Sequence, residues 1–402
     1  MKIGLVIEWL DPRRGGAETS TRQFINRLRA NGVELKVCTR SLIPSESGLT
    51  VETIEPHAMS RAGRTAAFLD AAAEAMASAG CDLVHAFVPC RGADIYQPRG
   101  GTMPETIRRT LATRRSGVQR AAKRLAMRMN RRQRLMLSRE RSWLSGRQRP
   151  MVIAISRYVV RQLQEHYNYP DSHIRYILNG VETVSAGADE RAADRKAIRN
   201  RYGIGQHDFL LLQVCHNFRL KGVGCLLKAL SCLMGPLART RGSVDSTPDV
   251  SVRALIVGGG RPARWRRQAD RLGVADSVRF TGPSETVAAF FSAADALVHP
   301  TYYDPCSRVV LEAIAHRLPV LSTRYDGASE IIQDGISGFV LDSPDQLSEL
   351  ADRIRRLAQP DVRRRMSAAA GDLAERITMK RQADEVCALY SWLRRYGLEG
   401  FW

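Results

Sequence analysis

Residues 296–330 read ALVHPTYYDPCSRVVLEAIAHRLPVLSTRYDGASE, and this stretch decides the fold. An apolar strand is predicted to end at His299. A helix is then predicted to begin at Pro305, since Asp304 can serve as its N-cap and proline suits the first helical position. A second strand follows at Leu318–Ser322, leading into a glycine-containing loop. The succession of strand, helix and strand indicates a doubly wound α/β sheet, in which ligands bind where strands end and helices begin.

Two carboxylates, Asp304 and Glu312, fall at this predicted edge. The first N–H groups of a helix have no intrahelical acceptor, and the helix dipole favours an anion beside them. An anion flanked by hydroxyl-binding carboxylates fits the diphosphate of a nucleotide sugar. Capping of the helix is the competing explanation for Asp304.

The N-terminal segment repeats the pattern of strand, glycine loop and helix. An apolar run at 3–9 precedes Gly15 and Gly16, and an amphipathic helix is expected over 17–30. The two glycines either let backbone N–H groups approach a ligand or simply form a tight turn. His85 ends a later strand, where it is either structural or a ligand contact.

The second half begins again with a buried strand pattern after Asp208. Arg219 and Lys221 follow this strand and are predicted to open a helix. Cations are unfavourable in the first turn of a helix, so their presence there indicates a bound anion such as a diphosphate.

The net charge of +20 is concentrated in one segment. Residues 103–149 hold fifteen Lys and Arg and two acids, and no proline occurs between 107 and 148, so the segment is predicted to be helical. Apolar residues recur there every seven positions. We expect a basic helix on an anionic membrane surface, with Arg120, Arg124, Arg128 and Arg131 as contacts. A solvated helix face is the alternative, and the scarcity of aromatic residues argues against nucleic acid.

The composition is that of a globular protein, with 44% apolar and 25% charged residues. No apolar run reaches the roughly 20 residues needed to span a bilayer. The first apolar run looks like a strand rather than a signal peptide. The eight cysteines include no Cys-x-x-Cys pair, so free thiols in a cytoplasmic protein are expected.

Taken together, these motifs resemble the retaining glycosyltransferases of family 4 (glycosyl transferases group 1), which have the GT-B fold. The resemblance rests on two carboxylates separated by seven residues, Asp304 and Glu312, together with the motifs at Gly15-Gly16, Arg219/Lys221-Gly222, Gly258–Gly260 and Gly327–Glu330. Within the family, the chain looks most similar to the lipopolysaccharide core α-glucosyltransferases. It departs from the family pattern by having Asp at 304, Ser at 307 and Arg at 308.

The resemblance implies a role for each matching residue. Arg219 and Lys221 would neutralise the donor diphosphate, and backbone N–H groups of Ser307, Arg308 and Val309 would bind its distal phosphate. Glu312 would accept hydrogen bonds from the ribose and Asp304 from the transferred sugar. Gly15 and Gly16 would approach the donor from the other domain, and His85 would place the sugar or the acceptor. No metal or other cofactor is expected.

We therefore expect an α/β protein of GT-B fold, with two Rossmann-like domains facing across a cleft. The expected parts are an N-terminal domain (1–182), a linker (183–204), a donor-binding domain (205–378) and a C-terminal helix (379–402) that could dock on the first domain. The expected reaction moves a hexose, such as glucose, from a UDP-sugar to a lipopolysaccharide-core-like or lipid-linked glycan at the inner face of the cytoplasmic membrane. The alternatives are a GT-B sugar-nucleotide epimerase or phosphorylase, and a non-enzymatic basic protein that binds membrane or nucleic acid. Donor sugar, acceptor and linkage are not readable from sequence.

Overall fold

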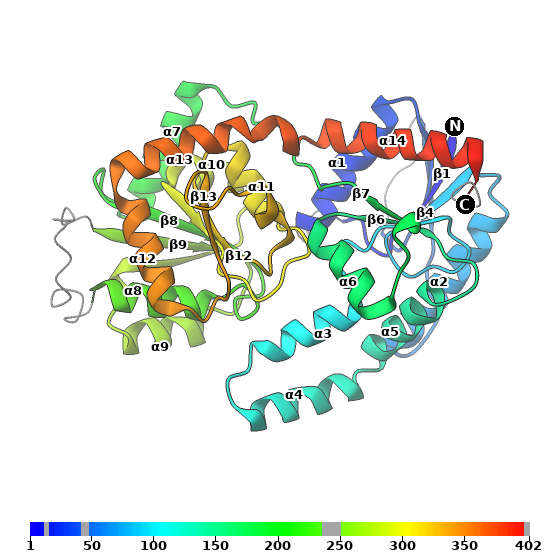
Figure 1. Cartoon of the computed structure of the whole chain (residues 1–402), viewed down its shortest axis with the longest axis horizontal. Coiled ribbons are helices and arrows are strands. Elements are labelled where there is room, and N and C mark those ends of the chain that lie inside the picture. The colour runs from blue at the N-terminus through cyan, green and yellow to red at the C-terminus, as the bar shows by residue number, and fades with distance from the viewer. Residues whose placement is uncertain (12–15, 42–47, 235–250, 398–402) are drawn as a thin grey trace. The chain divides into compact units, whose positions relative to one another are not determined.

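The computed structural model describes residues 1–11, 16–41, 48–234 and 251–397. The chain divides into two compact units, one formed by residues 1–182 with 377–402 and the other by residues 183–376 (Figure 1). Each unit is built around one parallel sheet with helices on both faces. Two parallel-sheet α/β units are the architecture expected for GT-B.

The first unit contains a seven-stranded sheet of order β3-β2-β1-β4-β5-β6-β7. Its strands are β1 (Lys2–Val6), β2 (Glu34–Thr39), β3 (Leu49–Thr53), β4 (Leu83–Ala86), β5 (Ile95–Tyr96), β6 (Met151–Ala154) and β7 (Ile174–Tyr176). Its helices are α1 (Gly16–Ala30), α2 (Arg61–Ala77), α3 (Met103–Ala112), α4 (Gly117–Met129), α5 (Arg131–Leu144), α6 (Arg157–Tyr167) and α14 (Met379–Tyr396).

Helices α1 and α14 share one face of this sheet. Ile3 and Leu5 of β1 belong to the same buried cluster as Phe24 of α1 and Tyr390 of α14. Gly4 points to the opposite face, because successive strand residues alternate. A Cβ atom on Gly4 would lie 2.5 Å from the sulfur of Met76, so α2 packs closely there.

The second unit contains a six-stranded sheet of order β10-β9-β8-β11-β12-β13. Its strands are β8 (Phe209–Val214), β9 (Val252–Val257), β10 (Val278–Gly282), β11 (Ala296–Val298), β12 (Val320–Thr323) and β13 (Gly338–Leu341). Its helices are α7 (Ala188–Arg201), α8 (Val223–Met234), α9 (Ala263–Arg271), α10 (Val287–Ala293), α11 (Arg308–Ala315), α12 (Leu347–Ala358) and α13 (Pro360–Asp372). Figure 1 shows α8 and α9 on one side of this sheet and α10 and α11 on the other.

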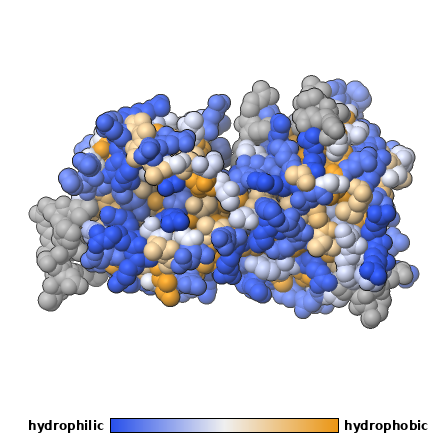
Figure 2. Space-filling model, turned by 90° about the horizontal axis from the view of Figure 1, so that it is seen from above, coloured by the Kyte–Doolittle hydropathy of each residue, from blue (hydrophilic) through white to orange (hydrophobic). Residues whose placement is uncertain are grey.

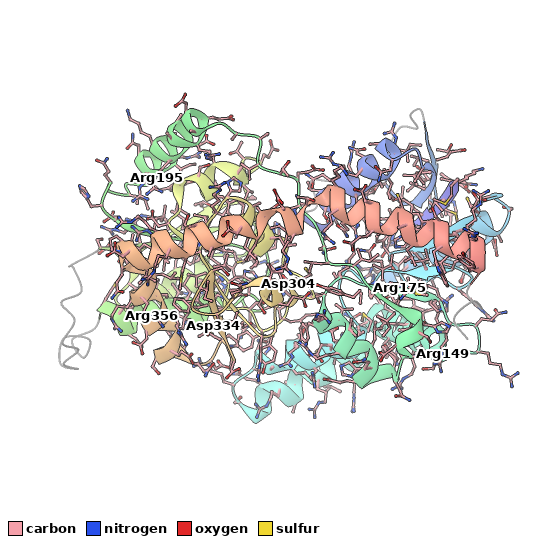
Figure 3. All side chains as sticks on the ribbon, turned by 45° about the horizontal axis from the view of Figure 1, so that its top comes forward. Arg149, Arg175, Arg195, Asp304, Asp334 and Arg356 are labelled. Atoms are coloured by element: carbon pink, nitrogen blue, oxygen red, sulfur yellow. The ribbon has the colours of Figure 1, made fainter. Side chains whose placement is uncertain are left out.

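The segment expected to be an irregular linker is largely helical. Helix α7 packs on α10, and Arg199 donates hydrogen bonds to the carbonyl oxygens of Ala293 (3.0 Å) and Gly205 (2.8 Å). Arg195, labelled in Figure 3, pairs with Asp295 at 2.8 Å. The polar composition of α7 led to the linker prediction, but Arg195 and Arg199 anchor the helix through hydrogen bonds and Ile198 is buried.

The basic segment is also not one long helix. It forms α3, α4 and α5, with breaks at residues 113–116 and at Asn130. Ser116 and Asn130 cap the two later helices by accepting hydrogen bonds from Gln119 and Gln133. These caps explain why helical propensity alone overestimated the length. Among the described residues, none of the helices combines the length and apolarity that crossing a bilayer requires.

Candidate active site

The candidate site in the second unit lies where the strand order of the sheet reverses. Strands β8 and β11 are neighbours there, and their C-terminal loops meet. The Tyr302 amide donates to the carbonyl oxygen of Leu220 at 2.8 Å, and the Thr301 hydroxyl donates to the same oxygen at 3.2 Å. Such a switch point is the usual ligand site of a doubly wound sheet.

Gly222 makes this close approach possible. Its φ is +70°, and a Cβ atom there would lie 1.9 Å from the carbonyl oxygen of Pro300. Only glycine tolerates both conditions. The turn it closes, residues 219–222, precedes α8, so Arg219 and Lys221 lie before the helix rather than in its first turn.

Lys221 forms an ion pair with Asp304. Its Nζ lies 2.5 Å from the Asp304 Oδ2 and donates to the Tyr303 carbonyl oxygen at 3.0 Å. Burial alone would raise the pKa of Asp304, but the adjacent Lys221 ammonium and His299 outweigh it and hold the pKa well below its usual range. Asp304, labelled in Figure 3, is therefore an ionised carboxylate. Two roles were predicted for Asp304, a contact with the transferred sugar and, as the alternative, capping of the following helix.

That capping prediction is wrong, because α11 begins at Arg308 and Ser307 occupies its N-cap position. The backbone of Asp304 is paired with the loop after β12. Its amide donates to the Tyr325 carbonyl oxygen and its carbonyl accepts from Gly327, both at 2.8 Å. This strand-like pairing holds the chain extended and delays the start of the helix.

Asp326 is a third carboxylate at the site, which the sequence analysis missed. Its Oδ1 accepts hydrogen bonds from the amides of Ser307 (3.0 Å) and Ala328 (2.9 Å), and its Oδ2 lies 2.9 Å from the Ser322 hydroxyl. Burial and the nearby charge of Asp304 raise the pKa of Asp326 to about 7. The available signal was its position, four residues after the predicted strand Leu318–Ser322 and in the loop at the ligand edge.

His299 completes the buried cluster. Its Nε2 lies 3.4 Å from the Ser307 hydroxyl and 3.8 Å from the Asp304 Oδ2. Burial lowers the pKa of this histidine, and the Lys221 charge lowers it further, although Asp304 acts in the opposite direction. The neutral ring therefore hydrogen-bonds the Ser307 hydroxyl and lies beside Asp304 without a direct hydrogen bond to it.

Glu312 pairs with Arg308 one turn earlier on α11, with Nε and Oε1 separated by 2.6 Å. Arg308 thus provides the charge partner that a carboxylate among apolar residues requires. Ser307 and Val309 flank Arg308 at the start of α11, and the Ser307 amide, which the resemblance assigned to the donor phosphate, donates to Asp326 instead.

The remaining predicted residue of this unit, Arg219, is half-buried in the turn before α8. No ion pair joins its guanidinium to a carboxylate in the part of the chain that the structure describes. Its backbone carbonyl accepts the Gly222 amide at 3.3 Å. Arg219, Lys221, Asp304 and Glu312 therefore all lie at or beside the same strand ends.

The predicted residues of the first unit give a different result. Gly15 lies outside the described residues, and Gly16 is the first residue of α1. His85 is fully buried, and its Nδ1 lies 2.6 Å from the Tyr390 hydroxyl. Burial lowers the pKa of His85 to about 3, and its ring stacks on Phe87. His85 is therefore better explained as a structural residue than as a ligand contact.

Two family models match the chain. The model for glycosyl transferases group 1 matches residues 211–360, and the model for glycosyltransferase family 4 matches residues 14–185. The chain therefore belongs to the glycosyltransferases that these two models describe. The first model covers the whole carboxylate motif and the turn that holds Lys221.

Curated relatives agree with this assignment. The lipopolysaccharide glucosyltransferase WaaG of Escherichia coli K12 is 29% identical over 205 residues, which are 51% of this chain and 52% of the relative. A D-inositol 3-phosphate glycosyltransferase of Nocardiopsis dassonvillei is 32% identical over 250 residues, 61% of this chain and 56% of the relative. The chain thus matches about half the length of these relatives.

Solved structures support the fold. The crystal structure of WaaG superposes with a TM-score of 0.76 at 22% identity, covering 97% of this chain and 99% of that one. Anabaena HepE, solved with UDP-glucose, gives 0.69 at 19% identity, covering 98% of this chain and 100% of that one. These similarities confirm the GT-B fold.

Proposed function

We propose that this glycosyltransferase moves a hexose, glucose or a close relative, from a UDP-sugar to a glycan acceptor. The observation that carries the proposal is the Lys221–Asp304 pair at the switch point of the second sheet, beside the first turn of α11. Two similar proteins support the choice of donor: WaaG is a lipopolysaccharide glucosyltransferase, and HepE was solved in complex with UDP-glucose.

In the proposed reaction, negative charge grows on the departing diphosphate. Arg219 and Lys221 lie close in sequence on one turn, and the first amides of α11 have no intrahelical acceptor. Fixed cations and N–H dipoles stabilise that charge in the transition state without reorganising. The proposal therefore includes no metal ion, and Lys221 would divide its interaction between Asp304 and the donor.

Asp304 and Glu312 would contact the hydroxyl groups of the donor. Asp304 is ionised and held by Lys221, so it can accept hydrogen bonds from the transferred sugar. Glu312 is fixed by Arg308 and would accept from the ribose. We propose transfer with retention of anomeric configuration, in which the leaving phosphate takes the acceptor proton.

The proposed acceptor is a lipopolysaccharide-core-like or lipid-linked glycan at the cytoplasmic face of the membrane. Helix α4 supports a peripheral membrane contact, because Val118, Leu125 and Met129 are exposed on a helix that also carries Arg120, Arg124 and Arg128. Arg131 lies apart from these three, at the start of α5. Nucleic acid is not part of the proposal.

The decisive experiment is a panel of nucleotide sugars, with slow donor hydrolysis and calorimetric binding as the two measurements. We expect hydrolysis of a UDP-hexose by the wild type, and a loss of about tenfold or more in UDP affinity for Glu312→Gln, since a charge-assisted hydrogen bond contributes about 1.5–3 kcal/mol. Arg364→Gln, an exposed variant of the same unit, is the control.

Four results would contradict the proposal. Absence of both binding and hydrolysis for every donor would leave no glycosyltransferase activity to explain. Epimerised product without an acceptor would indicate an epimerase, and cleavage that depends on phosphate would indicate a phosphorylase. Membrane binding by both the wild type and Glu312→Ala, with no donor bound by either, would favour a non-enzymatic basic protein.

A further inference from the structure

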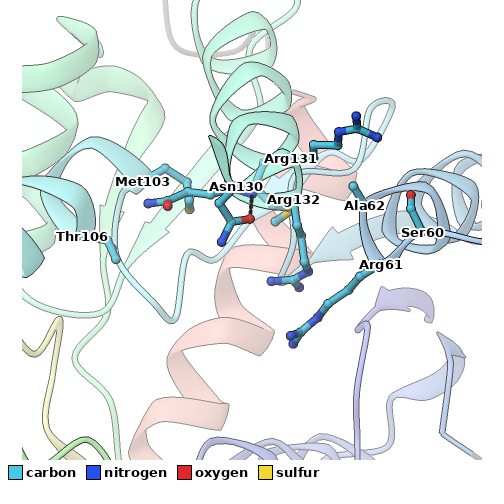
Figure 4. Close-up of a pocket in the computed structure, with 10 residues that line it drawn as sticks. Ser60, Arg61, Ala62, Met103, Thr106, Asn130, Arg131 and Arg132 are labelled. Atoms are coloured by element: carbon cyan, nitrogen blue, oxygen red, sulfur yellow. Dashed lines mark hydrogen bonds between the residues drawn. The ribbon is translucent and has the colours of Figure 1, made fainter. Parts of the chain in front are cut away.

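The first unit contains a cavity of about 650 Å³, which we call the arginine pocket. It lies between the start of α2, the start of α5 and helix α3, and its lining includes Arg61, Arg131, Arg132, Thr106 and Gln133. A smaller cavity of about 190 Å³ shares Arg61 and Arg132 with it. Figure 4 shows the side chains of Arg61 and Arg132 extending toward one another from α2 and α5.

The charge of the arginine pocket is largely uncompensated. No carboxylate is among its lining residues, and Glu8 lies in the smaller cavity. Glu8 is already shared, since Arg132 donates to it at 2.6 Å and Arg40 at 3.2 Å. Within residues 1–11, 16–41, 48–234 and 251–397, no acid pairs with Arg61 or Arg131. An anion is therefore the ligand that this pocket would hold.

Two helix starts add to this positive potential. Arg61 is the first residue of α2, and Arg131 and Arg132 are the first two of α5. Neither helix has an acid in its first turn. Arginine there faces the positive end of the helix dipole, which is unfavourable unless an anion is bound. The first two amides of each helix also lack an intrahelical acceptor and can donate to that anion.

The rest of the lining is neutral and held in place. Thr106 and Gln133 offer hydrogen-bonding groups, and Met103 and Met136 offer apolar surface. The start of α3 is fixed because the Met103 amide donates to the buried Glu140 carboxylate at 2.8 Å. A cavity with one cationic side and one mixed neutral side suits a phosphorylated sugar, and its volume lies in the range of small-ligand sites.

We propose that the arginine pocket binds a phosphate monoester carried by the acceptor sugar. Arg61 and Arg131 would pair with the phosphate, and the amides at the two helix starts would donate to its oxygens. Thr106 and Gln133 would meet hydroxyl groups of the same sugar. The inference rests on the proposed glycosyltransferase function and narrows its acceptor to a phosphorylated glycan.

The test is calorimetric binding of inorganic phosphate and of matched pairs of hexose phosphates and hexoses to the full chain. We expect the wild type to bind the phosphorylated member of each pair. Arg61→Gln and Arg131→Gln should each raise its Kd about tenfold or more, as expected for the loss of one charge-assisted contact. Arg124→Gln on α4 removes the same charge outside the pocket and should leave binding unchanged. UDP-sugar hydrolysis should also be unchanged in both pocket variants.

The possible outcomes separate this inference from the proposed function. Equal binding of phosphorylated and plain hexoses, or equal weakening by Arg124→Gln, would overturn it. Vesicles of phosphatidylglycerol provide the second source of phosphate. Binding to them that depends on Arg61 and Arg131, without binding of any soluble hexose phosphate, would assign the pocket to a lipid headgroup and also overturn it. If the wild type hydrolyses no donor, the proposed glycosyltransferase function is contradicted, whereas the phosphate site in the arginine pocket is not.

Discussion

The ammonium of Lys221 lies 2.5 Å from the Oδ2 atom of Asp304, and both side chains are only 18% exposed. The pair joins the turn before α8 to the loop after β11. It is thus both an electrostatic feature of the candidate donor site and a link between two loops of the second unit.

Lys221→Met should destabilise the second unit more than removal of both charges. It leaves the Asp304 carboxylate largely buried without its cation, a change that lowers the free energy of unfolding by about 3 kcal/mol in comparable pairs. Lys221→Met/Asp304→Asn should recover part of this loss. Urea unfolding measures both. Arg364→Gln removes an exposed pair with Asp361 and should change stability by less than about 1 kcal/mol. A double variant less stable than Lys221→Met would contradict the burial argument.

Gly222→Ala should be more destabilising than Gly273→Ala. Both glycines have a positive φ, +70° and +67°, so each alanine pays about 1–2 kcal/mol in backbone strain. Only at Gly222 does the new Cβ atom also collide with the Pro300 carbonyl oxygen, whereas nothing lies within 4 Å at Gly273. The difference in thermal unfolding midpoint between the two variants measures the collision. Equal midpoints would show that the loops separate without penalty.

Asp326→Asn should reduce the pH dependence of stability. The folded-state pKa of Asp326, about 7, lies above the ordinary value of about 4, so its contribution to stability is complete below about pH 4 and is lost as pH rises through about 7. The amide can still accept from Ser307 and Ala328 and can donate to Ser322. Unfolding between pH 4 and 8 should therefore show a smaller decrease with pH in the variant.

Glu140→Gln is the matched comparison in the other unit. Burial raises the pKa of Glu140 to about 7, although hydrogen bonds from Tyr167 and Met103 oppose the rise. It should reduce the pH dependence of the first unit in the same range. An unchanged profile in both variants would contradict the raised values.

The exposed apolar side chains of α4 should decide membrane binding. Val118 is 80% exposed, Leu125 61% and Met129 72%, and positions 118, 125 and 129 share one helix face. Replacing all three with serine should weaken sedimentation with phosphatidylglycerol vesicles about tenfold or more, since burial of each contributes on the order of 1 kcal/mol. Met59→Ser removes a fully exposed methionine outside α4 and is the control. Equal effects of the two changes would argue against a membrane contact by α4.

The arginines of α4 should add an electrostatic part to this binding. Replacing Arg120, Arg124 and Arg128 with serine should weaken vesicle binding, and raising the salt concentration should weaken the wild type in the same way. Vesicle binding that changes neither with the arginine replacements nor with salt would contradict an electrostatic contribution.

Apolar periodicity made the larger elements of the fold predictable. Helix α1 (Gly16–Ala30) lies within one residue of the helix expected over 17–30, and α14 begins at residue 379 as expected, because amphipathic helices leave clear patterns. Strands β3, β5 and β13 were missed. Strand β5 has only two residues and β3 is half polar, so neither has a hydrophobic pattern long enough to recognise.

The candidate site was predictable in its residues but not in its pairings. Glycine, cation and carboxylate positions after strand ends indicated Lys221, Asp304 and Glu312. The pairing of Lys221 with Asp304 joins loops more than 80 residues apart, which no local pattern encodes. Asp326 was missed because its role depends on Ser307 and Asp304, which only the folded loops bring beside it.

The chain leaves the first unit and returns to it at one place. The Val181 amide donates to the Ile377 carbonyl oxygen at 2.8 Å, and the Met379 amide donates to the Val181 carbonyl oxygen at 2.7 Å. A Cβ atom on Gly180 would lie 2.4 Å from the Thr378 carbonyl oxygen, so the two passing segments are in tight contact. During synthesis, residues 183–376 therefore emerge complete while the first unit still lacks α14. The second unit can fold as a continuous piece, whereas the first must wait for the end of the chain to cover the α1 face of its sheet.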